Sequence, residues 1–391
     1  MSTKVRTRAK NQARSSGSKV RVTRLLPVLD FGGVETRAVN QCRQMDFEGI
    51  DFRICTFWKK GDAAKKIEAT GIPIDVLDVA PAIRNPRATL ELMRYLREQP
   101  TDILHCAINE ANFHGSIAGR LSGVACTVVE EVGDPLVRST RGHAVIGLTM
   151  HLANHCVGVS KPVANYLSED LYVPRSKVTH IDNGVPAVEP PMAEERAEAR
   201  REFGIPLDAM VVGSVGRLDD KHKRFSHLIE AVSLISSPED NVYVMIVGEG
   251  RDKEAIRNAA DELGIGDRVI LTGYQSDTRK MYGMMDVFGL LSEQEAFGLV
   301  VAEAMFCELP VVVSDVGGMS EIVVEGETGF KVPRLQPDRA AERLASLLDS
   351  EEMRVRMGAA GRQRALKKYS TERYTADVRE LYLKLRDQFV E

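Results

Sequence analysis

Two carboxylates in this sequence, Glu295 and Glu303, stand with seven residues between them, and Phe297-Gly298-Leu299-Val300 fills the middle of that interval. Apolar runs predict a buried strand at 288–291 and a helix at 299–306. A loop that leads into a helix presents free backbone N–H groups and the positive end of a dipole, which suit a phosphate. We therefore expect Glu295 on the loop and Glu303 in the helix to reach one phosphate-bearing ligand.

Two cations follow another predicted strand, at 210–215. Arg217 comes directly after that strand within Gly213-Ser214-Val215-Gly216-Arg217-Leu218, and Lys223 follows six residues later. A guanidinium can bind two phosphate oxygens at once, and a lysine adds a point charge. A solvated basic loop is the alternative interpretation, since charged runs usually lie on the surface. Arg217 and Lys223 are candidates for binding the same phosphates.

The elements that would position these groups alternate between apolar strands and amphipathic helices. Helices are predicted at 34–47, 86–97 and 113–121 of the first half. Such alternation predicts a parallel, doubly wound α/β sheet, which binds ligands at the carboxyl ends of its strands. The predicted strands of the first half are 20–29, 52–57, 74–79, 103–108, 126–132, 155–159 and 177–181.

The pattern breaks at 184–208, where three prolines precede a charged helix at 193–203, so we place a linker there. A second alternating unit follows, and the chain from Asp338 is helical, with breaks near Ser350 and Ser370. The predicted strands of the second unit are 210–215, 243–247, 269–271, 286–291 and 310–314. The expected organisation is a first domain at 20–186, a linker at 187–208, a second domain at 209–369 and a last helix at 370–391.

The composition is that of a soluble globular protein. Of 391 residues, 43% are hydrophobic and 28% charged, a length that suggests two domains. The net charge of −4 gives no sign of a nucleic-acid binder. No apolar run approaches a membrane span and no secretory signal is visible, so we expect a cytoplasmic protein. The cysteines are scattered without metal-type spacing, and we expect them to be reduced and mostly buried: Cys42, Cys55, Cys106, Cys126, Cys156 and Cys307.

Residues 1–19 contain six basic and no acidic side chains, among Ser, Thr, Gln and Gly. Such a segment cannot bury a core, and we expect it to be disordered. It is either a solubilising tail or a segment attracted to anionic lipid headgroups. The second interpretation would place the protein peripherally at the inner face of a membrane.

Several motifs of the chain occur in a telling order. They are Gly32-Gly33-Val34-Glu35; 157–160 with Asp182-Asn183-Gly184-Val185; Gly216-Arg217-Leu218 with Lys223; the E-x7-E pair; and Asp315-Val316-Gly317-Gly318 through Glu321. In this order and strand–helix context, the chain resembles the retaining glycosyltransferases of the GT-B fold, family 4 (group 1), over nearly its whole length. The resemblance implies two Rossmann-like domains facing across a cleft, with the last helix crossing back to the first domain.

The resemblance also implies roles in binding a nucleotide-diphosphate sugar. Arg217 and Lys223 would neutralise the departing diphosphate, together with the backbone amides at Phe297-Gly298-Leu299-Val300, and the family usually needs no metal or other cofactor. Gly33 would let the first-domain backbone approach the phosphates. Of the remaining donor residues, Glu303 would bind the ribose hydroxyls, Glu295 would contact the sugar and face the anomeric centre, and Tyr274-Gln275 would border the base.

The acceptor is expected in the first domain. Many relatives carry a histidine after the strand that matches 126–132, but this chain has Val132 or Glu131 there. Glu131 and Asp134 become candidates for contacting the acceptor or the donor sugar. Asn112 could line the same cleft, as could His114, although a capping Asn and a core or surface His are alternative interpretations. The lone Trp58 could stack on a sugar or belong to the core.

The function implied is transfer of a hexose-type sugar from a UDP- or GDP-sugar to an acceptor hydroxyl, in polysaccharide, glycolipid or natural-product biosynthesis. The acceptor would be a sugar, a lipid-linked or a small molecule. No residue here is an obvious nucleophile with a base beside it, so same-face departure and attack is expected. A sugar-nucleotide epimerase of the same fold and a non-catalytic sugar-nucleotide-binding module remain alternatives.

Overall fold

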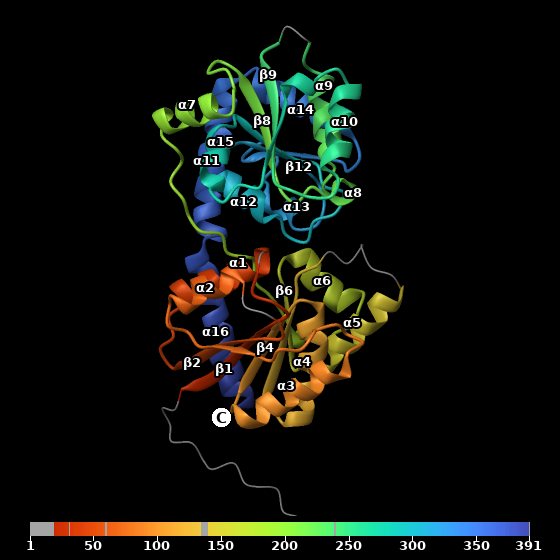
Figure 1. Ribbon diagram of the computed structural model, residues 1–391, viewed down its shortest axis with the longest axis vertical. Helices are drawn as coiled ribbons and strands as arrows, with labels where there is room; N and C mark the ends of the chain where they lie inside the picture. Colours follow the sequence, from red (N-terminus) through yellow and green to blue (C-terminus); the bar gives the residue numbers. More distant parts are fainter. Residues whose placement is uncertain (1–18, 31, 59–60, 134–139, 238–239, 391) are drawn as a thin grey trace, which may run out of the picture.

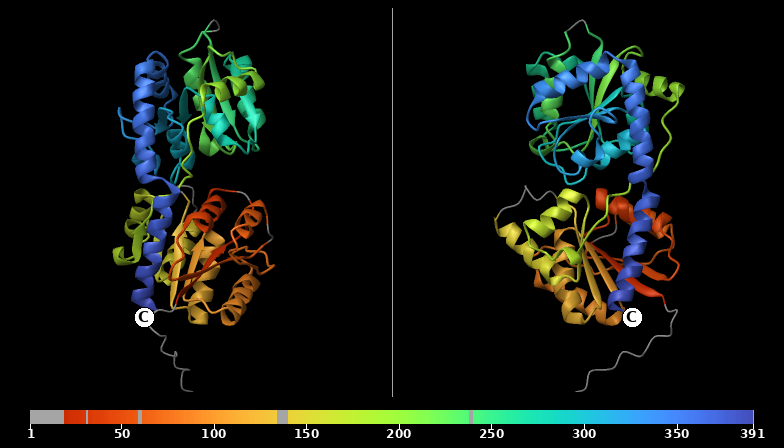
Figure 2. Two further views of the ribbon diagram at one scale, coloured as in Figure 1. Left: turned by 90° about the vertical axis from the view of Figure 1, so that its left-hand side faces the viewer. Right: turned by 180° about the vertical axis from the view of Figure 1, so that it is seen from behind.

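The computed structural model describes residues 19–30, 32–58, 61–133, 140–237 and 240–390. It contains two α/β layers, each made of one β-sheet and the helices around it, stacked along the long axis (Figure 1). The basic segment at 1–19 lies outside the described residues except for Lys19, and so does Asp134. Helices cover both faces of each sheet (Figures 1 and 2). The predicted fold class, two doubly wound parallel sheets, is therefore confirmed.

The first sheet has seven strands in the order β3-β2-β1-β4-β5-β6-β7 among the described residues, and the paired strands run parallel. Strands buried on both faces explain the continuous apolar runs in the sequence. The strands are β1 (Val20–Leu26), β2 (Ile50–Thr56), β3 (Ile74–Val76), β4 (Ile103–Ala107), β5 (Cys126–Glu131), β6 (His155–Gly158) and β7 (Val178–His180).

The helices of this layer divide between the two faces of the sheet. On one face α1 (Gly33–Gln44), α2 (Asp62–Glu68) and the last helix of the chain share a core with β1 and β2. The opposite face packs against α3 (Pro86–Glu98), α4 (Asn109–Ser122), α5 (Thr140–Leu152) and α6 (Lys161–Glu169).

The second sheet has six described strands in the order β10-β9-β8-β11-β12-β13, again parallel. The strands are β8 (Met210–Val215), β9 (Val242–Val247), β10 (Val269–Gly273), β11 (Val287–Leu290), β12 (Val311–Ser314) and β13 (Gly329–Val332). The helices around it are α7 (Ala193–Glu202), α8 (Asp220–Lys223), α9 (Phe225–Ser233), α10 (Lys253–Glu262), α11 (Thr278–Gly283), α12 (Leu299–Phe306), α13 (Met319–Ile322), α14 (Pro337–Leu348) and α15 (Glu351–Lys368).

The last helix, α16 (Thr371–Phe389), returns to the first sheet, as predicted (Figure 2). Its apolar positions at helical spacing enter the same core as β1 and β2. The Tyr382 hydroxyl also lies 2.7 Å from Nδ1 of His105 on β4. Helix α16 therefore ties the C-terminal end of the chain to the first sheet through buried contacts.

Element boundaries differ from the predictions by a few residues. Strand β1 ends at Leu26 rather than at 29, because Pro27 has no N–H to continue the ladder. Helix α4 begins at Asn109, four residues before the predicted start. Helix α12 matches the prediction. The six cysteines are buried and none is in a disulfide, as expected.

Candidate active site

The loop before α12 turns sharply into the helix at Gly298. Its φ of 103° lies in the left-handed region, which favours glycine. The turn at Gly317-Gly318 packs against this loop. A Cβ at Gly317 would lie 1.7 Å from the Glu295 carbonyl oxygen, and one at Gly318 would lie 2.6 Å from Phe297 Cα. The glycine pair that follows β12 thus holds the loop through close backbone contact.

Lys223 and Glu295, predicted to bind parts of one ligand, form an ion pair with each other. Their side chains are 23% and 17% exposed. Arg224 and Glu293 form a second ion pair beside the first, and the Glu293 N–H donates to the His222 carbonyl at 2.9 Å. Because an ammonium has three donors, Lys223 can hold Glu295 and still offer an N–H to a phosphate.

Arg217 is exposed directly after β8. Its guanidinium has no hydrogen bond or ion pair within the described parts of the chain. Its charge acts on Glu35 of α1, in the first layer: burial raises the pKa of Glu35, and the nearby positive charges of Arg37 and Arg217 oppose that rise. Arg217 therefore lies near enough to the first layer for its charge to act on Glu35.

The two layers touch at the loop before α12. A Cβ at Gly33, at the start of α1, would lie 2.8 Å from Cδ1 of Leu299. The Ser160 hydroxyl, at the start of α6, donates to the Ala296 carbonyl at 2.8 Å. The glycine loop of the first layer and the E-x7-E loop of the second are thus brought together.

Glu303 receives a hydrogen bond of 2.8 Å from the Tyr282 hydroxyl of α11. Burial raises the pKa of Glu303, and the bond from Tyr282 opposes that rise. The carboxylate lines a hollow of about 170 Å³ between the layers, whose other walls are Thr36, Val185, Pro186, Val188, Thr278, Arg279 and Tyr282. Sequence reasoning missed Tyr282, because nothing in the spacing of α11 links it to α12.

Tyr274 follows β10 and is 53% exposed. The neighbouring Gln275 side-chain amide donates to the Thr272 carbonyl at 3.0 Å, which shapes this turn. Neither residue lines the hollow beside Glu303. Their contact with a base stays a prediction.

Two family models match the chain in succession. Residues 31–188 match the model described as Glycosyltransferase Family 4, and residues 195–364 match the one described as Glycosyl transferases group 1. These models together span most of both layers. The chain belongs to glycosyltransferase family 4, group 1.

Individual proteins are similar to part of this chain. A D-inositol 3-phosphate glycosyltransferase of Corynebacterium efficiens is 40% identical over 174 residues, 42% of this chain and 40% of that protein. The N-acetyl-alpha-D-glucosaminyl L-malate synthase of Bacillus anthracis is 29% identical over 188 residues, 48% of this chain and 49% of that protein. These matches span less than half the length of either relative.

A solved structure shows the same fold over most of the chain. Anabaena HepE, crystallised with UDP and glucose, superposes with a TM-score of 0.82 at 18% identity and covers 93% of this chain and 100% of its own. The two layers of this family 4 chain therefore form a GT-B fold.

Two of the acceptor candidates, Asn112 and Glu131, lie at the carboxyl end of β5. The buried Asn112 amide donates to the Glu130 carbonyl at 2.8 Å, which fastens α4 to β5 rather than capping a helix. Glu131 is also buried and accepts a bond of 2.8 Å from the Gly133 N–H. The third candidate, Asp134, lies outside the described residues. Roles in acceptor binding stay predictions for all three.

The two aromatic candidates have clear positions. His114 is buried and lies 2.8 Å from the Thr89 hydroxyl and 3.1 Å from the Pro81 carbonyl, so its interpretation as a core histidine is confirmed. Trp58 is 42% exposed, and its interpretation as a core residue is wrong. Stacking of Trp58 on a sugar stays a prediction.

A buried ionic cluster behind the glycine loop was missed by sequence reasoning. Glu130 of β5 pairs with Arg24 of β1 at 2.7 Å and with Arg37 of α1 at 2.6 Å, and all three side chains are at most 2% exposed. Burial would raise the pKa of Glu130, but the charges of Arg37 and Arg24 prevail and lower it to about 2. Arg37 also donates to Asn183 in the segment between β7 and α7. The sequence signal that could have indicated this cluster is a charged residue inside each of two apolar strands, Arg24 in β1 and Glu130 in β5.

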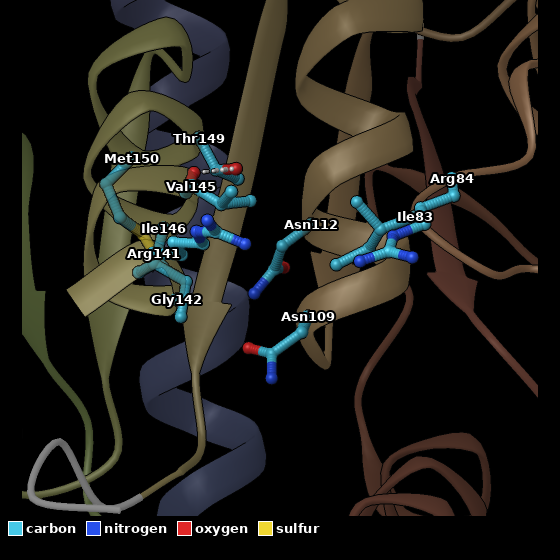
Figure 3. Close-up of a pocket in the computed structure, with 10 residues that line it drawn as sticks. All are labelled: Ile83, Arg84, Asn109, Asn112, Arg141, Gly142, Val145, Ile146, Thr149 and Met150. Carbon is cyan, nitrogen blue, oxygen red and sulfur yellow. Dashed lines mark hydrogen bonds between the residues drawn. The ribbon is translucent and has the colours of Figure 1, made fainter. Parts of the chain in front are cut away.

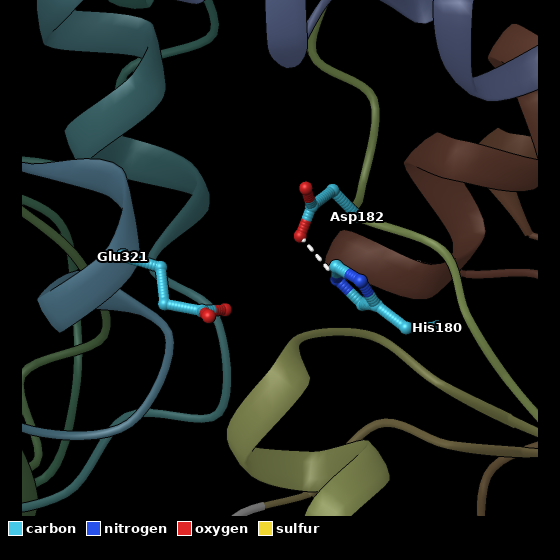
Figure 4. Close-up of side chains that lie close together, drawn as sticks. All are labelled: His180, Asp182 and Glu321. Atoms are coloured by element: carbon cyan, nitrogen blue, oxygen red, sulfur yellow. Dashed lines mark hydrogen bonds and ion pairs between the residues drawn. The ribbon is translucent and has the colours of Figure 1, made fainter.

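A possible metal-binding group lies where the two layers meet: His180, Asp182 and Glu321, whose ligand atoms lie within 4.8 Å of one another (Figure 4). His180 Nε2 already lies 2.7 Å from the Asp182 carboxylate. Glu321 accepts a bond of 3.0 Å from the Lys161 N–H of α6. These polar groups therefore already have partners within the protein.

Proposed function

We propose that this protein is a retaining glycosyltransferase that moves a hexose-type sugar from a UDP- or GDP-sugar to an acceptor hydroxyl. One observation carries the proposal: the loop that carries Glu295, paired with Lys223 of α8, leads into α12 where Gly33 of the first domain meets Leu299. A diphosphate at that junction would meet backbone N–H groups, a helix dipole and two cations.

The donor would lie along α12. Glu303, beside the hollow between the layers, would accept hydrogen bonds from the ribose hydroxyls. Arg217 and Lys223 would bind the diphosphate, and Gly33 would allow close approach of the first-domain backbone. Glu295, held by Lys223, would contact the sugar hydroxyls and face the anomeric carbon.

In the transfer step, the bond from the anomeric carbon to the diphosphate oxygen breaks and a bond to the acceptor oxygen forms on the same face. The acceptor proton passes to the departing phosphate oxygen. Arg217, Lys223 and the amides of α12 stabilise the negative charge as it develops. The pairing of Glu295 with Lys223 favours this route over covalent attack by Glu295, because the ammonium lowers the nucleophilicity of the carboxylate.

The comparisons support the donor class in part. HepE was crystallised with UDP and glucose, and that likeness, at 18% identity, concerns the fold. The names of the two relatives describe transfer of sugars to small molecules. We propose a nucleotide-sugar donor for this chain because of the arrangement of four residues: Arg217, Lys223, Glu295 and Glu303. We also propose that the transfer belongs to the biosynthesis of a polysaccharide, glycolipid or natural product.

The test is nucleotide release by purified protein with UDP-, GDP- and ADP-sugars, with and without candidate acceptors. Release that depends on an acceptor, and a product whose anomeric proton coupling in NMR matches the donor, would support retaining transfer. A changed sugar without an acceptor would indicate an epimerase, and binding without turnover a binding module. Arg217→Gln should lower turnover by about 10²–10³-fold. Wild-type turnover in that variant would exclude the proposed site.

We also propose that the protein acts without a metal and near a membrane surface. The cations at the diphosphate site would replace a metal ion in neutralising charge.

No helix in the described residues is both long and apolar enough to cross a membrane. Attraction of the basic residues at 1–19 to anionic lipid rests on their charge alone. Co-sedimentation with vesicles, with and without residues 1–19, would test it.

A further inference from the structure

A second pocket, of about 380 Å³, lies in the first domain between three elements (Figure 3). Its walls are the loop before α3, the first turn of α4 and one side of α5. This volume lies within the range of small-molecule sites. The lining residues are Ile83, Arg84, Asn109, Asn112, Arg141, Gly142, Val145, Ile146, Thr149 and Met150.

The charged residues among the described lining of this pocket are both cations. Arg84 and Arg141 are exposed, and their guanidinium groups approach the pocket from opposite sides, with Asn109 and Asn112 between them (Figure 3). Neither guanidinium has a hydrogen bond or ion pair in the described ranges of the chain. No carboxylate is among the described lining residues. Two cations without counter-ions make an anion the complementary ligand.

The rest of the wall is apolar. Val145, Ile146 and Met150 come from α5, and Ile83 faces them from the loop before α3. The Thr149 hydroxyl is occupied by the Val145 carbonyl at 2.8 Å, and the Asn112 amide by the Glu130 backbone. A ligand here would therefore place an acid group near the arginines and an apolar part against α5.

The pocket also lies beside the proposed donor site. Asn109 begins α4 after β4, and Gly33 begins α1 after β1. Strands β1 and β4 are parallel neighbours, so their carboxyl ends lie about 4.8 Å apart at one edge of the sheet. A molecule in the pocket could thus present a hydroxyl toward the phosphate-binding edge.

We propose that this pocket binds the acceptor, and that the acceptor is a small molecule carrying a phosphate or a carboxylate beside an apolar part. Arg84 and Arg141 hold the acid group, and Val145, Ile146 and Met150 contact the apolar part. The acceptor role of this ligand rests on the proposed transferase function. The binding of an acid in this pocket is independent of that function and can be measured separately.

The experiment measures binding of phenyl phosphate, benzoate and benzyl alcohol by calorimetry, with UDP kept saturating so that the donor phosphate site is occupied. At least one acid should bind about tenfold or more tightly than the neutral alcohol. The tighter of the two acids identifies the acid group. Binding to vesicles that contain phosphatidic acid is measured in parallel. Equal binding of all three small probes, or binding to the vesicles alone, would overturn the proposal.

Arg84→Gln and Arg141→Gln should each weaken binding of the preferred acid by about tenfold and leave UDP affinity unchanged. Arg120→Gln is the matched control, since Arg120 is exposed on α4 and does not line the pocket. All three variants change exposed side chains, and thermal unfolding checks that each is folded. Acid binding unaffected by both pocket variants would overturn the proposal. Failure of the wild type to bind UDP would count against the donor site only.

Discussion

The Tyr282 hydroxyl of α11 donates a hydrogen bond of 2.8 Å to the Glu303 carboxylate of α12. Burial nevertheless raises the pKa of Glu303, which means that the ionised carboxylate is destabilised at its position in the folded protein. A carboxylate kept at such a position is what a ribose-binding role would require, since two hydroxyls would satisfy it when the donor binds.

Glu303→Gln should therefore separate binding from stability. Glutamine keeps an acceptor for Tyr282 but has no buried charge, so the variant should be more stable than the wild type by about 1 kcal/mol at neutral pH. Its affinity for the donor nucleotide should fall about 10- to 100-fold. Calorimetry and denaturant unfolding on the same samples measure both quantities. A variant that loses stability and keeps its affinity would contradict the proposed role.

The stability difference for Glu303→Gln should depend on pH. Because the folded-state pKa is raised above the ordinary glutamate value of 4.5, the favourable contribution of the protonated carboxyl is fully present below pH 4.5. It is lost as the pH rises through the folded-state pKa. Unfolding free energies of both proteins should therefore converge below pH 4.5 and diverge towards neutral pH. Parallel curves over the whole range would argue against a raised pKa.

Lys223→Met should lower turnover by about 10²–10³-fold, because it removes a cation from the departing diphosphate and leaves Glu295 unpaired. Arg224→Met is a matched control, since it breaks the neighbouring pair with Glu293 on the same two segments. Steady-state kinetics with the best donor compare the two. Equal losses would assign both pairs a purely structural role.

Ser160→Ala should raise the KM for the donor several-fold, because the Ser160 hydroxyl holds the Ala296 carbonyl from across the domain boundary. The same hydroxyl caps α6, so about 1 kcal/mol of stability should also be lost. Ser350→Ala removes a comparable cap from α15, at Met353, without touching the loop. If both variants change the KM alike, the contact with Ala296 has no part in donor binding.

Glu130→Gln should destabilise the fold by about 3–5 kcal/mol, since it leaves Arg24 and Arg37 buried without an anion. The folded-state pKa of Glu130 is lowered to about 2, so its contribution to stability is fully present above the ordinary glutamate pKa of 4.5. That contribution is lost as the pH falls through about 2.

Urea unfolding of wild type and Glu130→Gln between pH 7 and pH 3 measures this effect. The difference between the two proteins should be constant down to about pH 4.5 and then shrink. Burial lowers the pKa of His105, 4.0 Å from Glu130, well below its usual value, so His105 should not titrate near neutral pH. A difference that vanishes already at pH 6 would point to another titrating group.

Chelation should leave the donor site unchanged. The proposed role of Arg217 and Lys223 in neutralising the diphosphate predicts equal UDP affinity and turnover with EDTA and with Mg²⁺. Loss of activity in EDTA that Mg²⁺ or Mn²⁺ restores would contradict metal independence. A Glu321→Gln variant would then show whether the group of His180, Asp182 and Glu321 holds the ion.

Much of the architecture could be predicted because the signals are local. An apolar run marks 299–306 and apolar residues at helical spacing mark the last helix, and both helices occur where they were predicted. Apolar strands separated by such helices determine a parallel sheet with ligands at its carboxyl ends. The order of the motifs along the chain then pointed to the family.

Contacts between distant segments depended on the order of strands in each sheet. Lys223 and Glu295 are 72 residues apart, and Arg24 and Glu130 are 106 apart. Arg24 and Glu130 meet because β1 and β5 are separated in the sheet by β4 alone, although the two strands are far apart in the sequence. No local pattern contains that information.

The sequence by itself thus determined the two α/β units, the helix carrying Glu303 and the candidate cations. Tertiary structure decided that Lys223 holds Glu295, that Tyr282 reaches Glu303 and that Gly317-Gly318 supports the loop between them. It also decided that Arg84 and Arg141, 57 residues apart in number, face one pocket. The physical reason is that periodicity reports which face of an element is buried, whereas the partner across a boundary follows from how whole elements pack.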